Sequence, residues 1–442
     1  MAIKLFEHFD YRKLIKFTLP SIAMMIFTSL YGVVDGLFVS NLVGEIPFAA
    51  VNFIMPYLMI LGTMGFMLGT GGSALVSKMM GEGDAKRANQ TFSMLVYITI
   101  IFGFVLTVVG FFTIKPVALL MGASGDMLEY CVLYGQILCL ALPAHLLQFA
   151  FQGFLVASEK PQLGLYFTLA GGIANIVLDA LFMGALGWGI AGAAIATAIS
   201  QAVSGIAPLT YFARKNSSLL RLCRARLDLG ALLKTCTNGS SELMSNISMS
   251  LVGMLYNVQL MSYAGEAGVS AYGVMMYVNF VFISIFIGYS VGIAPVISYH
   301  FGAQNHDELK GLRRRSVVII MVLSACMLGL GQLLAPLLTK IFVGYSPELY
   351  ALTLRGFRFF CFSFLFAGMA IFGSSFFTAL NDGVTSAIIS FLRTLVFQIV
   401  AVIVLPLIWQ TDGIWASIIV AELMAFLVTV FFMALKRKKY NY

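Results

Sequence analysis

Two aspartates, Asp35 and Asp179, lie deep inside long apolar stretches of the sequence. Asp35 stands in the run Y-G-V-V-D-G-L-F-V-S-N, and Asp179 ends the run N-I-V-L-D, which begins at Asn175. A spacing of four residues places Asn175 and Asp179 on the same face of a helix. An ionisable side chain in apolar surroundings costs about 3 kcal/mol or more, so both carboxylates require a partner or a function.

Two carboxylates and an amide in one pocket could bind a cation in two ways. Loss of water and repulsion between like charges favour a proton on one carboxyl group, so the pair could take up and release H⁺. Alternatively, the oxygens of Asp35, Asn175 and Asp179 with a nearby hydroxyl could hold Na⁺, because hard cations prefer oxygen ligands. A third possibility is a structural hydrogen-bond network without transport chemistry. The residues alone leave these alternatives open.

Other polar residues also interrupt the apolar runs. Arg393 and Glu422 are expected to pair with each other or to anchor helix ends. Glu242 either faces a cavity, where it would meet a cationic substrate, or lies in solvent near the start of its helix. Four residues are candidates for lining a substrate cavity: Gln148, Gln152, Glu242 and Asn279.

The runs that hold these residues have the length and composition of membrane helices. Hydrophobic residues make up 60% of the 442 residues and charged residues only 10%, against about 25% in soluble domains. A run of about 20 apolar residues crosses a hydrocarbon layer of about 30 Å. The sequence predicts twelve such helices, at 14–39, 48–78, 91–114, 128–157, 163–184, 190–213, 232–263, 269–300, 315–339, 350–379, 384–408 and 414–435.

Lys and Arg are concentrated at the two ends of the chain and in alternate connections between the helices. These positions are Lys4, Arg12, Lys13, Lys16, Lys86, Arg87, Lys160, Arg214 to Lys234, Lys310, Arg313 to Arg315 and Lys436 to Lys439. By the positive-inside rule, both termini are expected in the cytoplasm of a multi-pass membrane protein. The same distribution accounts for the net charge of +8, so no nucleic-acid partner is expected.

The two halves of the sequence resemble each other. A shift of 221 residues places Gly44, Gly71 and Gly81 on Gly265, Gly292 and Gly302. Six helices per half is an even number, so the repeats are expected to run parallel, as in transporters whose halves rock about a central site. The predicted division is an N-terminal lobe at 1–213, a cytoplasmic linker at 214–230 and a C-terminal lobe at 231–442.

The buried aspartates are not repeated. Under this repeat Asp35 falls on Tyr256, and with a small change of register Asp179 falls among the apolar residues 401–403. Any cation chemistry of the pair is therefore predicted for the N-terminal lobe alone. Enzymatic motifs such as H-E-x-x-H and G-x-S-x-G are missing from the sequence, and no cofactor is expected.

Four motifs in this order and spacing resemble the multidrug and toxic compound extrusion (MATE) transporters. They are Pro20 followed by V-D-G-L-F-V at 34–39, G-T-G-G-S at 69–73, N-x-x-x-D at 175–179 and G-I-A-G-A-A-I-A-T at 189–197. The resemblance covers the whole chain and is to a bacterial multidrug-resistance branch. It implies a V-shaped pair of six-helix bundles that exports amphipathic, often cationic drugs by antiport with H⁺ or Na⁺.

The resemblance also implies a set of functional residues. A cation site would be formed by Asp35, Asn175, Asp179 and Thr197, completed by a backbone carbonyl near Ala193, and the first helix would bend at Pro20. The expected surroundings are the lipid of a bacterial inner membrane, and the expected oligomeric state is a monomer. A second cation site in the C-terminal lobe is not expected, because the run 350–379 has no buried acid.

Two rival functions follow from the same residues. One is a lipid-linked saccharide flippase of the same superfamily, which would need cationic side chains for a pyrophosphate, and Arg393 is the one clear candidate. The other is a membrane protein that does not transport.

Overall fold

A computed structural model describes residues 3–344 and 346–442, and within these residues the chain is helical and has no strand. The N-terminal half contains α1 (Tyr11–Leu42), α2 (Glu45–Gly81), α3 (Ala85–Leu120), α4 (Gly125–Leu140), α5 (Leu142–Ala157), α6 (Pro161–Asp179), the π-helix η1 (Ala180–Ala185) and α7 (Gly189–Ala213). The C-terminal half contains α8 (Leu229–Gly302), α9 (His306–Val343), α10 (Pro347–Cys361), α11 (Phe364–Ala379), α12 (Gly383–Phe391), the π-helix η2 (Leu392–Val396), α13 (Phe397–Val404), α14 (Pro406–Leu435) and α15 (Arg437–Tyr440).

The predicted count of twelve membrane helices is confirmed, with differences in shape. Among the described residues, nine helices are long and apolar enough to cross a membrane, and two bent helix pairs raise the number to eleven. The twelfth is the first part of α8, residues 229–264, which is richer in Ser, Asn and Thr than the others. It joins the second part at Gly265, where the backbone leaves the helical conformation.

The predicted single helices at 128–157 and 350–379 are each two helices with a bend. The α4–α5 pair is bent by 59° at Ala141, where Pro143 begins the next helix and cannot continue the hydrogen-bond ladder of the previous one. The α10–α11 pair is bent by 48° without a proline, at Phe362 and Ser363. Ala141 and Phe362 are 221 positions apart, which is the shift of the sequence repeat.

The backbone repeats at this interval in its turns as well. Left-handed residues occur in pairs 221 positions apart, at Gly44 and Gly265, at Gly83 and Gln304, and at Gly189 and Gln410. Gln is an uncommon residue at positive φ, so the position in the fold, and not the residue type, determines the turn. The predicted internal repeat is thereby confirmed in the backbone.

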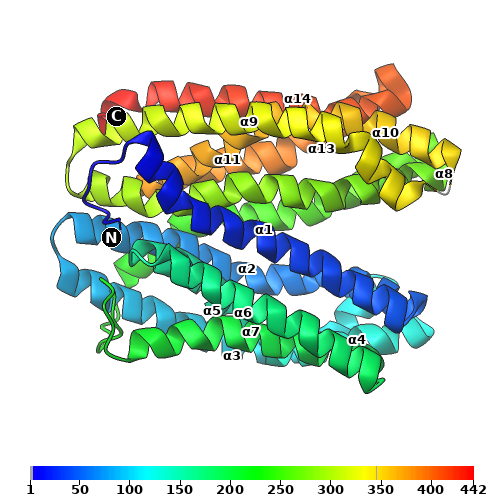
Figure 1. The fold of residues 1–442 in the computed structure, drawn as a ribbon, viewed down its shortest axis with the longest axis horizontal. Helices are drawn as coiled ribbons and strands as arrows, with labels where there is room; N and C mark the ends of the chain where they lie inside the picture. The colour runs from blue at the N-terminus through cyan, green and yellow to red at the C-terminus, as the bar shows by residue number, and fades with distance from the viewer. Residues whose placement is uncertain (1–2, 345) are drawn as a thin grey trace.

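The two bundles meet through glycines at the end of the molecule that holds both termini (Figure 1). Gly81 of α2 lies against the carbonyl oxygen of Tyr299 in α8, and Gly302 of α8 lies against the carbonyl oxygen of Lys78 in α2. Neither glycine has room for a methyl group, since small residues here let the backbones approach closely. The contact is reciprocal, as expected for two parallel repeats related by a two-fold axis.

Glycines of α1 and α8 that lie nearer the opposite end have free space around them. At Gly32 of α1 and at Gly253 and Gly273 of α8, an added methyl group would meet no neighbouring atom within 4 Å. The two bundles are therefore packed together at the end with the termini and diverge toward the other end, which gives the expected V shape.

The segment before α1 connects the two bundles at the closed end. The backbone N–H of Leu5 donates to Glu159 Oε1 at 2.7 Å, in the turn between α5 and α6. The backbone N–H of Phe9 donates to Glu308 Oε1 at 3.0 Å, in the first turn of α9. Leu5 and Phe9 are themselves fully buried. We call residues 3–10 the N-terminal strap.

Candidate cation-binding site

Three helices of the N-terminal bundle bring the predicted cation ligands together. Asp35 lies in the second half of α1, Asp179 is the last residue of α6, and Thr197 lies in α7. The α1 and α7 helices both pack against α6. The carboxyl groups of Asp35 and Asp179 lie close enough to interact electrostatically. Two residues 144 positions apart in the sequence thus form one site.

The polar atoms of this site are buried and lack hydrogen-bond partners. Asp179 and Asn175 are 0% and 1% exposed, and Ala193, one turn before Thr197, is fully buried. The unpartnered oxygens are Asp35 Oδ1, Asn175 Oδ1, Asp179 Oδ1, Asp179 Oδ2 and Thr197 Oγ1. Buried polar groups in proteins are nearly always hydrogen-bonded, so five such oxygens in one place need an explanation.

A bound cation would satisfy these oxygens. Carboxylate, amide and hydroxyl oxygens form the ligand set that a hard cation such as Na⁺ prefers. A proton shared between Asp35 and Asp179 would also relieve the repulsion between two buried carboxylates. The residues therefore fit either H⁺ or Na⁺ as the transported ion.

Two tyrosines border the site and were not predicted from the sequence. The hydroxyl of Tyr134, in α4, lies beside Thr197 and near both carboxylates, yet makes no well-formed hydrogen bond. Tyr31 lies beside Gln148 and near Asp35. Tyr31 precedes Asp35 by one helical turn, and this spacing could have identified it. No sequence signal identifies Tyr134, because it comes from another helix.

The equivalent position in the C-terminal bundle has no carboxylate. Tyr256, which corresponds to Asp35, is buried and donates a hydrogen bond from its hydroxyl to Gln398 Oε1 at 2.8 Å. Its ring stacks on Tyr272 with 5.2 Å between ring centroids. A hydrogen-bonded pair of neutral side chains thus occupies the place where the N-terminal bundle has acids without hydrogen-bond partners.

The predicted pairing of Arg393 with Glu422 is confirmed. Arg393 Nε donates to both carboxylate oxygens of Glu422, at 2.9 and 3.1 Å, and both side chains are largely buried. Glu242 lies close enough to Arg393 for a direct electrostatic interaction. Glu242 therefore shares the positive charge of Arg393 rather than lying alone in solvent.

Replacing Arg393 with Leu is expected to destabilise the protein by about 3–5 kcal/mol, because Glu422 would keep a buried charge without a partner. The double variant Arg393→Leu/Glu422→Leu should recover most of this loss. The measurement is thermal unfolding of the purified proteins in detergent. Equal stability of Arg393→Leu and the unchanged protein would contradict this role for the pair.

The remaining predicted residues lie in several places. Gln148 and Gln152 are buried inside the N-terminal bundle, where both line a small cavity between α5, α6 and α7 and not a space between the two bundles. Asn279 is buried in the second part of α8 with an unpartnered Oδ1. Pro20 lies inside α1, which continues as one helix through it, so bending at Pro20 stays a prediction.

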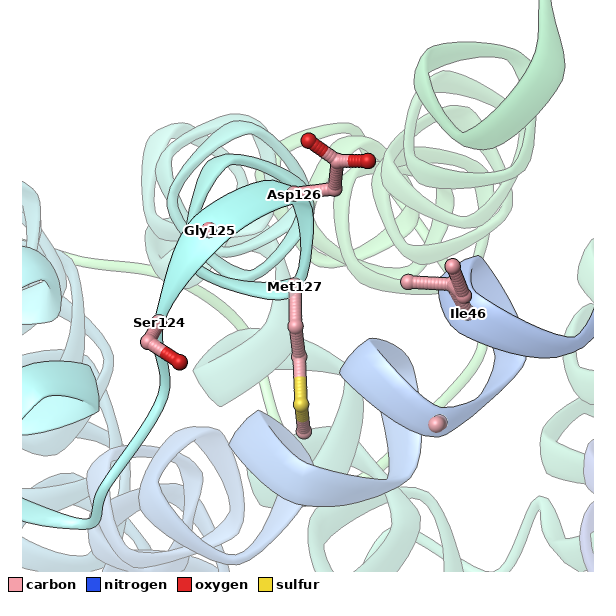
Figure 2. Close-up of a pocket in the computed structure, with 6 residues that line it drawn as sticks. Ile46, Ser124, Gly125, Asp126 and Met127 are labelled. Atoms are coloured by element: carbon pink, nitrogen blue, oxygen red, sulfur yellow. The ribbon is translucent and has the colours of Figure 1, made fainter.

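An open hollow of about 630 Å³ lies at the rim of the N-terminal bundle, between the start of α2 and the start of α4 (Figure 2). Figure 2 shows Met127 and Ile46 near each other, while the Asp126 carboxylate points away from Met127. The lining has one charged side chain and is otherwise apolar or small. It lacks a set of converging polar groups, so the buried cluster is the stronger candidate site.

Comparison with known proteins identifies the family. The MatE family profile matches residues 20–181 and again residues 243–404, once in each half of the chain. The chain is 24% identical over 429 residues to the Multidrug export protein MepA of Staphylococcus haemolyticus (strain JCSC1435), covering 97% of this chain and 94% of the relative. It is also 24% identical over 436 residues to MepA of Staphylococcus aureus (strain MRSA252), with the same coverage.

Solved structures of MATE proteins have the same fold. A crystal structure of MATE in complex with MaL6 superposes with a TM-score of 0.93 at 22% identity, over 98% of each chain. An outward-facing multidrug resistance MATE family transporter of the MOP superfamily also gives 0.93 at 22% identity, over 98% of this chain and 97% of that one. Since the family profile matches most of the chain, this protein belongs to the MatE family and is a membrane transporter, not an enzyme.

Proposed function

We propose that this protein exports amphipathic, often cationic compounds by antiport with H⁺ or Na⁺. The observation that carries the proposal is the group of buried, unpartnered oxygens around Asp35 and Asp179. A transporter driven by a cation needs a site that binds the cation and releases it again, and a permanently satisfied network would not do so. The relatives named Multidrug export protein MepA support the choice of substrate.

The first helix can couple the cation site to the space between the bundles. The second half of α1 carries Asp35 and packs against α6 of the N-terminal bundle. The first half packs against the other bundle, where Gly288 of α8 lies against Ser21 and Ile22. Occupancy of the site by a cation would favour one packing of α1, and the packing of α1 would in turn affect how the bundles meet.

The closed end defines the state of the transporter. With the termini in the cytoplasm, the glycine contacts between α2 and α8 close the cytoplasmic side, so this is an outward-facing state. Opening to the cytoplasm requires Gly81 and Gly302 to separate from the opposite bundle. It also requires the N-terminal strap to release Glu159 or Glu308, because the two belong to different bundles.

A gradient of the coupling ion supplies enough energy for this cycle. A tenfold concentration gradient is worth about 1.4 kcal/mol per ion, and the membrane potential adds to it when more positive charge enters than leaves with the substrate. Coupling between two ligands in proteins is typically about 1–3 kcal/mol. One cation per cycle is therefore sufficient to shift the balance between the two states.

The flippase alternative is weakened by the position of Arg393. Its Nε is engaged by Glu422, and Glu242 lies nearby. The net charge of these three groups is negative, which suits a cationic substrate and repels a pyrophosphate.

The proposal predicts that purified protein in proteoliposomes will move an organic cation dye in the direction opposite to the downhill flow of Na⁺ or H⁺. A tenfold or larger gradient of the coupling ion should raise the rate of dye movement about 10-fold over liposomes without a gradient, since a tenfold gradient corresponds to a tenfold bias per ion. Failure of both gradients to stimulate transport would contradict antiport. Stimulation by one gradient identifies the coupling ion.

A further inference from the structure

We infer that the small cavity between α5, α6 and α7 is a second polar site, which passes the coupling cation or its water from the Asp35–Asp179 site toward the end of the protein that holds the termini. This inference rests on the proposed antiport and names the route of the ion within it. The cavity is lined by Gln148, Gln152, Thr168 and Ser204, with the apolar residues Phe151, Leu155, Phe167 and Pro208 and with Gly164.

Two buried amide side chains at this cavity lack hydrogen-bond partners, as the oxygens of the cation site do. Gln152 is 4% exposed, and neither its Oε1 nor its Nε2 has a hydrogen-bond partner. Gln148 is 5% exposed and its Oε1 also lacks a partner. Buried amides without partners cost stability, so we expect them to bind water or an ion. The cavity has room for about one water molecule.

The helices place this cavity on the termini side of the cation site. The α5 and α7 helices end, and α6 begins, at the end of the molecule where the termini lie (Figure 1). From Asp179, α6 leads to Thr168 over eleven residues, which is about 16 Å at the rise of an α-helix. Along α7 the polar residues Thr197, Gln201 and Ser204 follow in the same direction.

The polar residues between the cation site and the cavity come from the three helices α5, α6 and α7. Gln201 Oε1 is buried without a partner, between Thr197 of the cation site and Ser204 of the cavity. Gln148 lies between the cation site and the cavity, because it is beside Tyr31 at the cation site and also lines the cavity. Unpartnered polar atoms thus occur at the cation site, at the cavity and at Gln201 between them.

The chemistry of the lining suits passage of a small ion and not binding of a drug. Amides and hydroxyls can replace part of the water around a cation, and neutral ligands release it again more readily than a carboxylate. A volume of about one water molecule excludes an organic substrate. Phe151, Leu155 and Pro208 line the cavity together with these polar groups.

The test compares Gln152→Leu and Thr168→Val with the unchanged protein in two assays. The first measures displacement of a bound organic cation dye by Na⁺ or H⁺ at equilibrium, and the second measures dye transport driven by a gradient of the same ion. Displacement should stay within about twofold, because the carboxylate site keeps all its ligands. Gradient-driven transport should fall about 10-fold, because an apolar passage hinders ions.

Thr99→Val serves as the matched control. Thr99 is fully buried in α3, and its hydroxyl donates to Leu95 O at 2.8 Å within its own helix, away from the cavity. Thr168→Val is nearly isosteric, so it decides the question if Gln152→Leu fails to fold. Unchanged transport in the cavity variants, or equal loss of displacement and transport, would overturn the inference. Absence of ion-dependent displacement in the unchanged protein would instead refute the proposed antiport.

Discussion

Asp35→Asn and Asp179→Asn are each expected to abolish cation-driven export while the protein stays folded in the membrane. The amide keeps the size and hydrogen-bonding capacity of the carboxyl group but carries no negative charge and cannot exchange a proton. Loss of a coupling of about 3 kcal/mol corresponds to a fall of about 100-fold in ion-stimulated transport. The measurement is dye efflux from proteoliposomes under the gradient that drives the unchanged protein.

Asp126→Asn is the control for removal of an acid from the same bundle. Asp126 is exposed in the first turn of α4, at the rim of the open hollow, so its replacement should leave transport unchanged. Thermal stability of all three variants separates a loss of function from misfolding. Persistent ion-stimulated export in both Asp35→Asn and Asp179→Asn would refute the coupling role of the pair.

Gly81→Ala and Gly302→Ala are expected to prevent closure of the end that holds the termini. Each new methyl group would collide with a backbone carbonyl of the opposite bundle, which cannot move without separating α2 from α8. Such overpacking costs about 1–3 kcal/mol, so the closed state should lose population by about 10-fold or more. Transport should fall accordingly, because the cycle requires both states.

Distances between spin labels on the two bundles at this end measure the effect directly. The labels should move apart in both glycine variants and stay in place in Gly253→Ala, since Gly253 has free space around it. A distance distribution identical to that of the unchanged protein, with normal transport, would show that these glycines do not control closure.

Much of the fold could be predicted from the sequence, because membrane helices are marked by long apolar runs. The bends could not be predicted equally well. The bend at Ala141 has a proline beside it, whereas the bend at Phe362 has none and is related to the first only by its equivalent position in the repeat. The turn at Gln410 could not be predicted from residue type either, since Gln rarely adopts a positive φ.

The carboxylates of the site could be predicted because a buried charge is costly wherever it occurs. Tyr134 could not be predicted, since its approach to Thr197 depends on how α4 packs against α7. The N-terminal strap could not be predicted either, because its partners Glu159 and Glu308 lie far along the chain, in or beside turns. Such contacts between distant segments leave no periodic pattern in the sequence.

The duplication of the fold and the asymmetry of its chemistry have different physical origins. Glycine contacts such as Gly81 with Tyr299 and Gly302 with Lys78 require both repeats to keep the same backbone. The proposed ion site would require only one repeat to keep buried acids, and Tyr256 with Gln398 fills the equivalent place in the other. The C-terminal bundle is thus free to provide packing and substrate contacts.

Displacement of a bound organic cation dye by Na⁺ or H⁺, measured on the purified full-length protein, tests this asymmetry most directly. Asp35→Asn in the N-terminal bundle is compared with Tyr256→Phe at the equivalent position of the C-terminal bundle. We expect Asp35→Asn to lose ion-dependent displacement and Tyr256→Phe to retain it. Retention in Asp35→Asn, or loss in a folded Tyr256→Phe variant, would contradict a cation site confined to the N-terminal bundle.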